Sequence, residues 1–342
     1  MTKIAVFGAG AIGCWVGGRL ATGGANVTLI GRARVMDELR GGLRVSELSP
    51  KARGAAAGVE DQRLWTVTPT TATDAAAAAD ADVVLVTVKS AATSEAGAAI
   101  ANTRGVVVSL QNGVRNADVL RAALPGRTVL AGMVPFNVAR VAAGRYHRGT
   151  SGELIVEAHA AAAPLVAACK AAELPLVLRD DMPAVLWSKL VMNLNNAINA
   201  LSGKPLAEQL ADRRFRRTLA AAQREALDLL DAAKQPTAKL LAASPRMIVR
   251  LLGIPDWLFR IIAKRVGSVD PLARSSMSDD FAAGRATEID YLQGEVVALA
   301  QRLGTTAPVN AKLVELVHAA EAGGRRDFTG AELLAAVTPP TA

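Results

Sequence analysis

A glycine-rich segment near the N-terminus constrains the fold of this chain more strongly than any other feature. An apolar run at residues 3–7 leads into Gly-Ala-Gly-Ala-Ile-Gly, and an Ala-rich stretch of helical character covers residues 11–21. In such a strand–turn–helix unit, the three glycines permit a tight turn, a close pyrophosphate and close helix–strand packing. The free N–H groups at the helix start attract phosphates. The segment predicts dinucleotide binding rather than an ordinary glycine turn, with cofactor contacts from Gly8, Gly10, Ala11, Ile12 and Gly13.

The first half of the chain alternates short apolar runs with Ala-rich segments. Strands are expected at residues 3–7, 26–30, 82–88 and 105–110, and helices at residues 11–21, 91–101 and 116–123. Nearly continuous Val, Leu and Ile runs are typical of parallel strands buried on both faces. The alternation predicts an α/β fold with a doubly wound sheet of the Rossmann type. A β-rich stretch follows at residues 128–138, and residues 144–158 read as a hairpin or an edge strand.

The pattern becomes helical at about residue 180. Residues 180–203 form one long helical pattern, with Asp180 or Asp181 as the expected N-cap and Pro183 in the first turn. The 342 residues suffice for two domains. We expect an α/β domain over residues 1–180 and an all-α domain over residues 181–336, followed by a disordered tail.

The end of the second expected strand indicates which dinucleotide binds. NAD enzymes usually carry an acidic residue there, which holds the 2′-hydroxyl of the ribose. This chain has Arg32 and Arg34 and no acid. A guanidinium suits a 2′-phosphate through charge-assisted, bidentate hydrogen bonds. The sequence favours NADP(H), with Arg32 the better placed; two solvated surface arginines are the alternative.

Two polar residues follow the next expected strands at their carboxyl ends, where open α/β sheets bind ligands. Lys89 ends the run 82–88, and Asn112 follows the run 105–110. Asn112 is suited to bind the nicotinamide or the substrate. Both residues have structural alternatives, because a lysine often ends a strand at the surface and Asn-Gly is a common turn sequence.

The expected helix at residues 180–203 carries a stripe of polar side chains. At about 100° per residue, Asn193 lies about 40° from Lys189, and Asn196 lies about 20° to its other side. Apolar residues flank the stripe. If it faces a cleft, burial lowers the pKa of Lys189 towards values useful for proton transfer. A stripe that faces water is the alternative.

A later segment, residues 275–295, carries further candidates. Ser275 and Ser276 are suited to bind a carboxylate, and Glu288 to pair with Lys189 and keep it charged before proton transfer. Taken alone, the segment reads as a capped, solvated helix with ordinary i,i+4 charge pairs.

Together these motifs indicate a family. The segments GAGAIG, TVKS, QNGV, LWSKLVMN and SSMSDDFAAGRATEIDY span nearly the whole chain, and the last two are the most specific. In this set and order, the chain resembles the ketopantoate reductase (2-dehydropantoate 2-reductase) family. The resemblance implies a Rossmann domain followed by a helical substrate or dimerisation domain, with the active site between them. It also implies NADPH-dependent reduction of ketopantoate to pantoate, by hydride transfer to C2, in pantothenate biosynthesis.

The resemblance also implies residue roles. The glycines would bind the pyrophosphate and Arg32 the 2′-phosphate. Lys189 matches the catalytic general acid, and Glu288 matches its acidic partner, which also borders the cofactor. Cofactor contacts are further implied for Lys89 and Asn112, and substrate contacts for Asn112, Asn193, Asn196 and Ser276, with Ser276 on the carboxylate.

Some features depart from the family pattern. Where the family places a second asparagine after the lysine, this chain has Ala197, with Asn196 beside it as the expected substitute. The segment MVPFNVARV replaces a Thr-rich pattern, and the spacer before Ser276 is long. The reaction type is unaffected, but the substrate stays open. The alternatives are reduction of another 2-oxo acid, as in D-2-hydroxyacid dehydrogenases, and a non-catalytic NADP(H) sensor.

The spacer, residues 204–270, has no assigned role. Its apolar, Arg-rich part predicts two short amphipathic helices broken at Pro255. A membrane-surface helix and a lid or subunit interface are the alternatives.

Composition argues against several other functions. Two cysteines are too few for a disulfide framework, and the three histidines lack metal spacing, so no metal is expected. A net charge of +8 spread along the chain, with 4% aromatic residues, argues against a nucleic-acid partner. No apolar stretch is long enough to span a membrane. Reduced thiols favour a cytoplasmic location, and a homodimer is left open.

Overall fold

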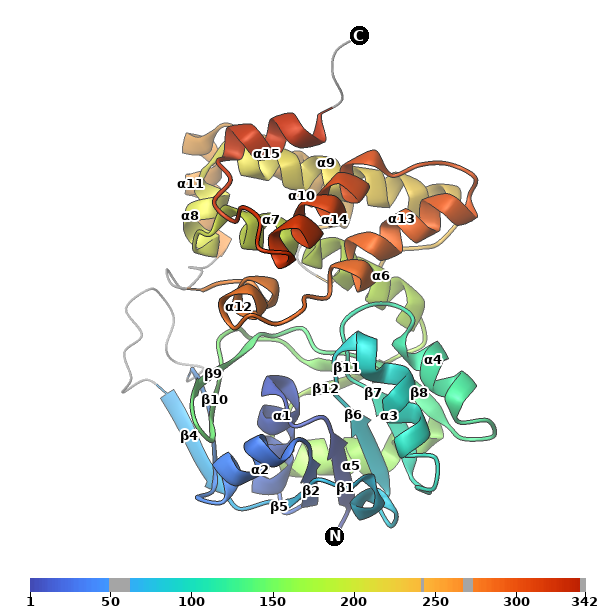
Figure 1. The fold of residues 1–342 in the computed structure, drawn as a ribbon. Coiled ribbons are helices and arrows are strands. Elements are labelled where there is room, and N and C mark those ends of the chain that lie inside the picture. The colour runs from blue at the N-terminus through green and yellow to red at the C-terminus, as the bar shows by residue number, and fades with distance from the viewer. Residues whose placement is uncertain (49–61, 241–242, 267–272, 339–342) are drawn as a thin grey trace. The chain divides into compact units, whose positions relative to one another are not determined.

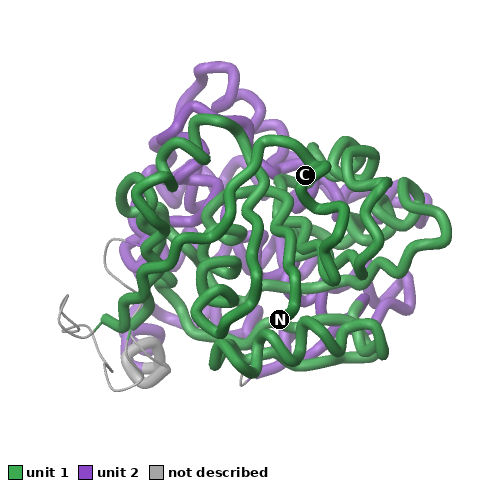
Figure 2. Tube along the Cα trace, turned by 90° about the horizontal axis from the view of Figure 1, so that it is seen from below, with its two compact units in different colours: residues 1–182 green, residues 183–342 purple. Residues whose placement is uncertain are grey.

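The computed structural model describes residues 1–48, 62–240, 243–266 and 273–338 (Figure 1). The chain divides into two compact units, residues 1–182 and 183–342 (Figure 2). The first unit is α/β and the second is helical. No helix in the described part of the chain is long and apolar enough to cross a membrane.

The main sheet of the first unit has eight strands. In order across the sheet they are β12 (Leu176–Arg179), β11 (Leu154–Glu157), β8 (Val129–Met133), β7 (Val106–Ser109), β6 (Val83–Val86), β1 (Lys3–Phe7), β2 (Asn26–Ile30) and β5 (Thr70–Ala72). From β8 to β5 all neighbours run parallel, in the Rossmann order. β11 pairs antiparallel with β8 and parallel with β12. The predicted doubly wound sheet is confirmed.

Both faces of this sheet are buried under helices. The helices are α1 (Ala11–Thr22), α2 (Ala33–Leu39), α3 (Thr93–Ala99), α4 (Asn116–Ala123) and α5 (Ala163–Ala171), with short 3₁₀ turns at η2 (Ala75–Ala78), η3 (Ser90–Ala92) and η4 (Ala160–Ala162). Ile4 and Val6 of β1 belong to the same core as Trp15 of α1, whereas Ala5 shares a second core with Leu120 of α4. Burial on both faces explains the nearly continuous apolar runs.

The sequence does not predict the second sheet of this unit. Its order is β4 (Gln62–Val67), β3 (Leu43–Leu48), β10 (Arg145–Arg148), β9 (Val138–Ala142). β9 and β10 form a hairpin, but β10 also pairs parallel with β3, far earlier in the chain, and β11 lies inside the main sheet. The second sheet packs on α1, where the indole N–H of the buried Trp15 donates to the Ser46 carbonyl at 3.0 Å.

The second unit corrects one expectation. The helix predicted over residues 180–203 is interrupted at Leu194, between α6 (Met182–Asn193) and α7 (Asn195–Ser202). The other elements are α8 (Leu206–Ala211), α9 (Arg213–Ala232), α10 (Pro245–Leu252), α11 (Asp256–Val266), α12 (Ser276–Ala282), η5 (Ile289–Tyr291), α13 (Gln293–Arg302), α14 (Pro308–Glu321) and α15 (Gly330–Val337). Residues 339–342 of the expected tail lie outside the described residues.

The spacer contains α10 and α11, separated at Pro255, so the prediction of two short helices is confirmed. Arg216 of α9 anchors them. Its completely buried guanidinium donates to the carbonyls of Leu252 at 3.2 Å and Ile254 at 2.8 Å, and pairs with Asp256 at 2.9 Å. One buried guanidinium therefore supplies hydrogen-bond donors to the carbonyls of the segment between the two helices.

Replacing this arginine should destabilise the protein. Arg216→Met leaves the carbonyl oxygens without their donor, so we expect a loss of about 3 kcal/mol in the free energy of unfolding. The matched control is Arg224→Met, an exposed arginine on the same helix, with a change below about 0.5 kcal/mol. Urea denaturation followed by circular dichroism measures both, and equal midpoints would contradict the anchoring role of Arg216.

Candidate active site

The turn between β1 and α1 has the geometry that its glycines predict. Gly8 adopts a φ of +116°, and a Cβ there would lie 2.7 Å from the Val88 nitrogen. A Cβ on Gly13 would lie 2.1 Å from the Gly8 oxygen. Both positions therefore require glycine. Gly10 differs, because a Cβ there would meet no atom within 4 Å.

The space at Gly10 and the start of α1 fit a dinucleotide phosphate. Gly10 is exposed and is the N-cap of α1, and no side chain caps the helix. The first-turn N–H groups of Ala11, Ile12 and Gly13 lack intrahelical acceptors by geometry. An anion at this place gains those donors together with the helix dipole. The turn can hold a pyrophosphate, and contacts from these residues stay a prediction.

Arg32 lies next to this turn through strand pairing. Phe7 of β1 pairs with Ile30 of β2, and the Ile30 carbonyl accepts the N–H groups of Gly8 at 2.9 Å and Ala9 at 3.2 Å. Arg32 follows two residues later, as the exposed N-cap of α2. No described residue forms an ion pair or side-chain hydrogen bond with its guanidinium, which is therefore available to an anion.

The loops after β6 and β7 carry Lys89 and Asn112 at the carboxyl edge of the sheet. Lys89 is exposed and precedes η3, and Asn112 is half-buried. Buried side chains join the two loops. Ser90 Oγ donates to the Asn112 carbonyl at 3.0 Å, and Asn116 Nδ2 donates to the same oxygen. Gln111 Nε2 donates to the Val88 carbonyl at 3.0 Å.

Sequence reasoning missed this supporting network. Thr93 Oγ1 accepts from Gln111 at 2.7 Å and donates to Asn116 Oδ1 at 2.8 Å. All three residues are buried. The sequence does carry a signal for this network, because polar residues directly follow two buried strands. Buried polar side chains at such a place are usually hydrogen-bonded to one another or to the backbone.

Lys189, on α6 of the second unit, is a candidate proton donor whose ionisation is perturbed by its surroundings. Burial on α6 lowers the pKa of its ammonium to about 8. Burial is the only cause, and no described residue forms an ion pair with it. The expected pair with Glu288 is therefore absent from the described contacts of Lys189. A lysine in this state can act as a proton donor near neutral pH.

The predicted stripe is divided between two helices. Lys189 and Asn193 lie one turn apart on α6, whereas Asn196 lies on α7, beyond the interruption. Asn196 is instead next to Ser276, the first residue of α12, with 3.5 Å between Nδ2 and Oγ. The structure thus brings together two of the predicted substrate-binding residues.

Ser275 has a structural role in the described residues, and the anion-binding role suggested for it stays a prediction. It is the buried N-cap of α12, its hydroxyl accepts from the Ser278 N–H at 3.2 Å, and it donates to the Asn196 carbonyl at 3.2 Å. Asn199, which the helical projection placed away from the stripe, accepts the Ser275 N–H at 2.9 Å. Completely buried, Asn199 supports the Ser276 segment, and no local signal in the sequence indicated it.

Glu288 lies just before η5, in a segment held by the last turn of α14. Glu321 accepts the N–H of Thr287 at 2.8 Å. His318 lies between Glu321 and Asp290, 2.9 Å from each carboxylate, and the two carboxylates raise its pKa. The residues on both sides of Glu288 are thus attached to one helix, Thr287 through its backbone N–H and Asp290 through its carboxylate.

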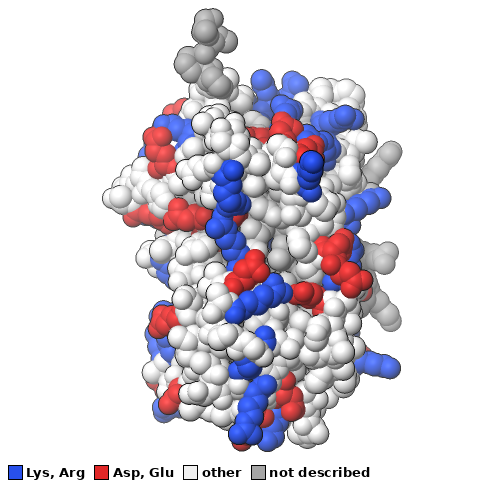
Figure 3. Space-filling model, turned by 90° about the vertical axis from the view of Figure 1, so that its right-hand side faces the viewer, with Lys and Arg blue, Asp and Glu red and all other residues white. Residues whose placement is uncertain are grey.

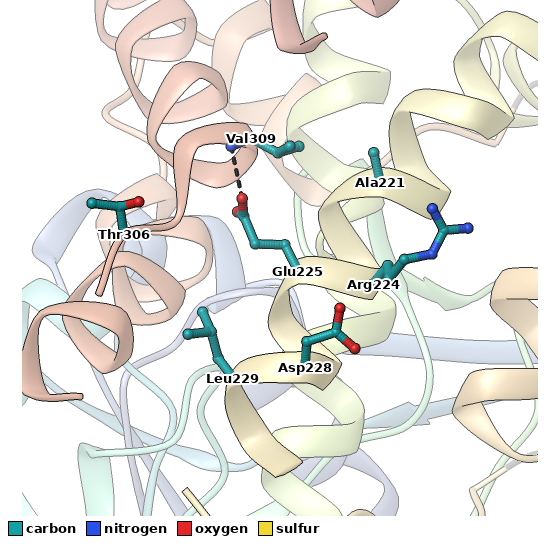
Figure 4. A pocket seen from close by; sticks show the side chains of 7 residues that line it. All are labelled: Ala221, Arg224, Glu225, Asp228, Leu229, Thr306 and Val309. Carbon is teal, nitrogen blue, oxygen red and sulfur yellow. Dashed lines mark hydrogen bonds between the residues drawn. The ribbon is translucent and has the colours of Figure 1, made fainter. Parts of the chain in front are cut away.

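A surface hollow of about 410 Å³ in the helical unit contains none of the predicted site residues (Figure 4). It is lined by Ala221, Arg224, Glu225, Asp228, Leu229, Thr306 and Val309. Glu225 already accepts the N–H groups of Val309 and Asn310, both at 2.9 Å, and Asp228 pairs with Arg246 at 2.7 Å. Because both carboxylates have partners, we assign the hollow no ligand.

In the part of the chain that the structure describes, neither the surface charge in view nor the metal-binding side chains indicate a second ligand site. Figure 3 shows basic and acidic side chains interspersed on the face in view. Among the described residues, no three His, Cys, Asp or Glu side chains gather closely enough to hold a metal ion.

Comparisons with known proteins identify the family of the chain. The family model for ketopantoate reductase PanE/ApbA matches residues 4–161, and the model for its C-terminal domain matches residues 181–321. The 2-dehydropantoate 2-reductase of Halobacterium salinarum is 29% identical over 335 residues, 94% of this chain and 100% of that protein. A PanE/ApbA family ketopantoate reductase from Ralstonia eutropha JMP134 is 30% identical, with a TM-score of 0.78 over 94% of this chain and 99% of that one.

The chain belongs to the ketopantoate reductase family. It is an oxidoreductase, and NADPH is the cofactor of its family. A D-mandelate dehydrogenase solved with NADH and anilino(oxo)acetate shares the fold, with a TM-score of 0.77 at 19% identity over 94% of this chain and 99% of that one.

A substitution at Gly10 should separate an effect on NADPH binding from an effect on folding. Gly10→Ala should cost less than about 1 kcal/mol of stability, because the added methyl meets no protein atom. It should weaken NADPH binding by about tenfold or more, since the methyl occupies the space for the pyrophosphate. Thermal melting and NADPH fluorescence titration test the two effects. Wild-type NADPH affinity in this variant would show that the pyrophosphate binds elsewhere.

Proposed function

We propose that this protein reduces ketopantoate to pantoate, as the names of its curated relatives suggest, and so serves pantothenate biosynthesis. The observation that carries the proposal is Lys189, a half-buried lysine on α6 whose pKa falls to about 8 through loss of solvent, in the region that matches the C-terminal family model. Such a group is largely protonated at neutral pH and gives up its proton readily.

Residues of the α/β unit hold the cofactor. When bound, NADPH supplies the hydride for the C2 carbonyl of the substrate. The backbone of residues 8–13 receives the pyrophosphate, and the guanidinium of Arg32 pairs with the 2′-phosphate. Lys89 and Asn112, at the carboxyl ends of neighbouring strands, border the nicotinamide.

Lys189 is the general acid. Its charge polarises the carbonyl, and its proton passes to the oxygen on which negative charge develops, so that hydride and proton together convert C=O into CH–OH. Glu288 borders the cofactor, as its place in the family motif implies. Ser276 donates a hydrogen bond to the substrate carboxylate. The amides of Asn193 and Asn196 bind its remaining oxygen atoms.

The role of Lys189 predicts a pH profile. The kcat of reduction should be level at lower pH and fall about tenfold per unit above about pH 8, because only the protonated lysine donates. Lys189→Ala should lower kcat by about 10²- to 10⁴-fold and leave the NADPH Kd within about twofold. Stopped-flow absorbance at varied pH measures this. Unchanged kcat in the variant, or a rate that rises above pH 8, would refute the mechanism.

Arg32 predicts cofactor selectivity. Arg32→Ala should raise the Kd of NADPH by about tenfold or more, as expected for the loss of a charge-assisted hydrogen bond, and change the Kd of NADH by less than about twofold. Arg34→Ala is the matched control, with little effect on either. Fluorescence titration gives all four constants, and equal losses for both cofactors would assign the 2′-phosphate to another residue.

A second candidate is the reduction of a bulkier, more apolar 2-oxo acid. The completely buried Ala197 at the position of the second family asparagine favours it, because it removes a polar group from that helix. Turnover of ketopantoate compared with a panel of aliphatic and aromatic 2-oxo acids distinguishes the two. Tight NADPH binding without turnover of any of them would instead favour a sensor. A cytoplasmic location, consistent with the free, buried Cys14 and Cys169, and a homodimer stay predictions.

A further inference from the structure

Two buried glutamines bind the backbone where the lysine-bearing helix is interrupted. Gln223 of α9 donates from Nε2 to the Val191 carbonyl at 3.0 Å. Gln293, the first residue of α13, donates from Nε2 to the Leu194 carbonyl at 2.8 Å. Gln293 is completely buried, and Gln223 is 4% exposed. Three helices that are distant in the sequence therefore meet at this junction.

These hydrogen bonds lie at the interruption, on the carbonyls of Val191 and Leu194. Side chains that enter the i→i−4 hydrogen-bond pattern are a recognised cause of helix kinks. The Leu194 N–H is shared here between the carbonyls of Leu190 at 3.1 Å and Val191 at 3.4 Å, as in a turn tightened towards 3₁₀ geometry. Buried carbonyls need donors. Gln223 and Gln293 supply donors to two of the carbonyls at this junction.

In each of the two glutamine amides, the N–H donor forms a hydrogen bond and the oxygen does not. Oε1 of Gln223 and Oε1 of Gln293 are buried and have no hydrogen-bond partner among the described residues. An unsatisfied buried oxygen costs stability, whereas an apolar side chain of the same size would avoid that cost. We therefore expect the contribution of the two amides to lie in the geometry of the junction.

We propose that Gln293 and Gln223 are positioning residues that fix the angle between α6 and α7. They thereby hold Lys189, which precedes the junction, at a set distance from Asn196 and Ser276, which follow it. The proposal rests on the proposed function, in which Lys189 donates the proton and the other two bind substrate. A displacement of reacting groups by about 1 Å costs about a hundredfold in rate, so a small rotation at the junction has a large effect on turnover.

The test compares Gln293→Met with a matched control, Asn310→Leu. Both substitutions remove an amide and roughly keep its volume. Asn310 is also completely buried and also has an unpartnered amide oxygen, but it donates to the Ala222 carbonyl, at 3.1 Å, and to Glu225, not to the junction. We expect both variants to lose stability.

Only the junction variant should change the chemistry. In Q293M, the KM for the oxo acid should rise and kcat should fall, each at least about fivefold, with the NADPH Kd within about twofold. In N310L, kcat and KM should stay within about twofold. Equal kinetic effects in both variants would mean general destabilisation and would overturn the proposal. Wild-type kinetics in a folded Q293M would also overturn it.

Hydrogen exchange provides a readout that does not depend on turnover. The backbone amides of residues 194–197 should exchange faster in Q293M than in the wild type, and not in N310L. If the wild type reduces no oxo acid, the proposed function fails, and this measurement still decides whether Gln293 holds the junction. If Q293M does not fold, Gln223→Met provides the same test through the Val191 carbonyl. Unchanged exchange in the folded variant would overturn the proposal.

Discussion

The close contact between α1 and the strands beneath it determines the geometry of the α/β unit. Gly13 lies directly against the Gly8 carbonyl, and the Thr87 hydroxyl donates to that same oxygen at 2.6 Å. The ends of β1 and β6 are thereby joined at one atom, and β2 is joined to them through Ile30. A side chain at residue 13 would push the helix away from all three strands. The positions of the glycine turn and of the loop of Arg32 therefore depend on the absence of a side chain at Gly13.

In the helical unit, the main constraint on the candidate site is the electrostatic effect of burial on Lys189. Removing an ammonium from water disfavours its charged form, which is why the pKa of Lys189 falls to about 8. An adjacent carboxylate would reverse this effect, and no described acid pairs with the lysine. A pKa in this range leaves the ammonium largely protonated at neutral pH and suits the proposed role as a general acid. The backbone that follows the lysine accepts hydrogen bonds from Gln223 and Gln293, two side chains that are themselves buried and uncharged.

Sequence reasoning located the features that depend on local pattern. The expected ranges 3–7, 26–30 and 116–123 coincide with β1, β2 and α4, because apolar runs and turn residues determine them. The candidate roles of Arg32 and Lys189, which came from the missing acid after the second strand and from a polar helical stripe, stay predictions. The second sheet was missed because β3 pairs with β10 across a long stretch of chain. The interruption at Leu194 was missed because its donors, Gln223 and Gln293, lie on other helices. Neither feature leaves a signal near its own residues.

The second sheet also affects how the chain is made. Trp15, early in α1, has its ring against Phe136 at 5.0 Å and under Arg148 at 5.0 Å, two residues that are synthesised much later. Contacts between segments far apart in sequence form slowly, and apolar surface that is exposed meanwhile favours aggregation. On the ribosome, the aromatic face of α1 stays uncovered until β10 has emerged. Until then, this apolar surface is open to aggregation.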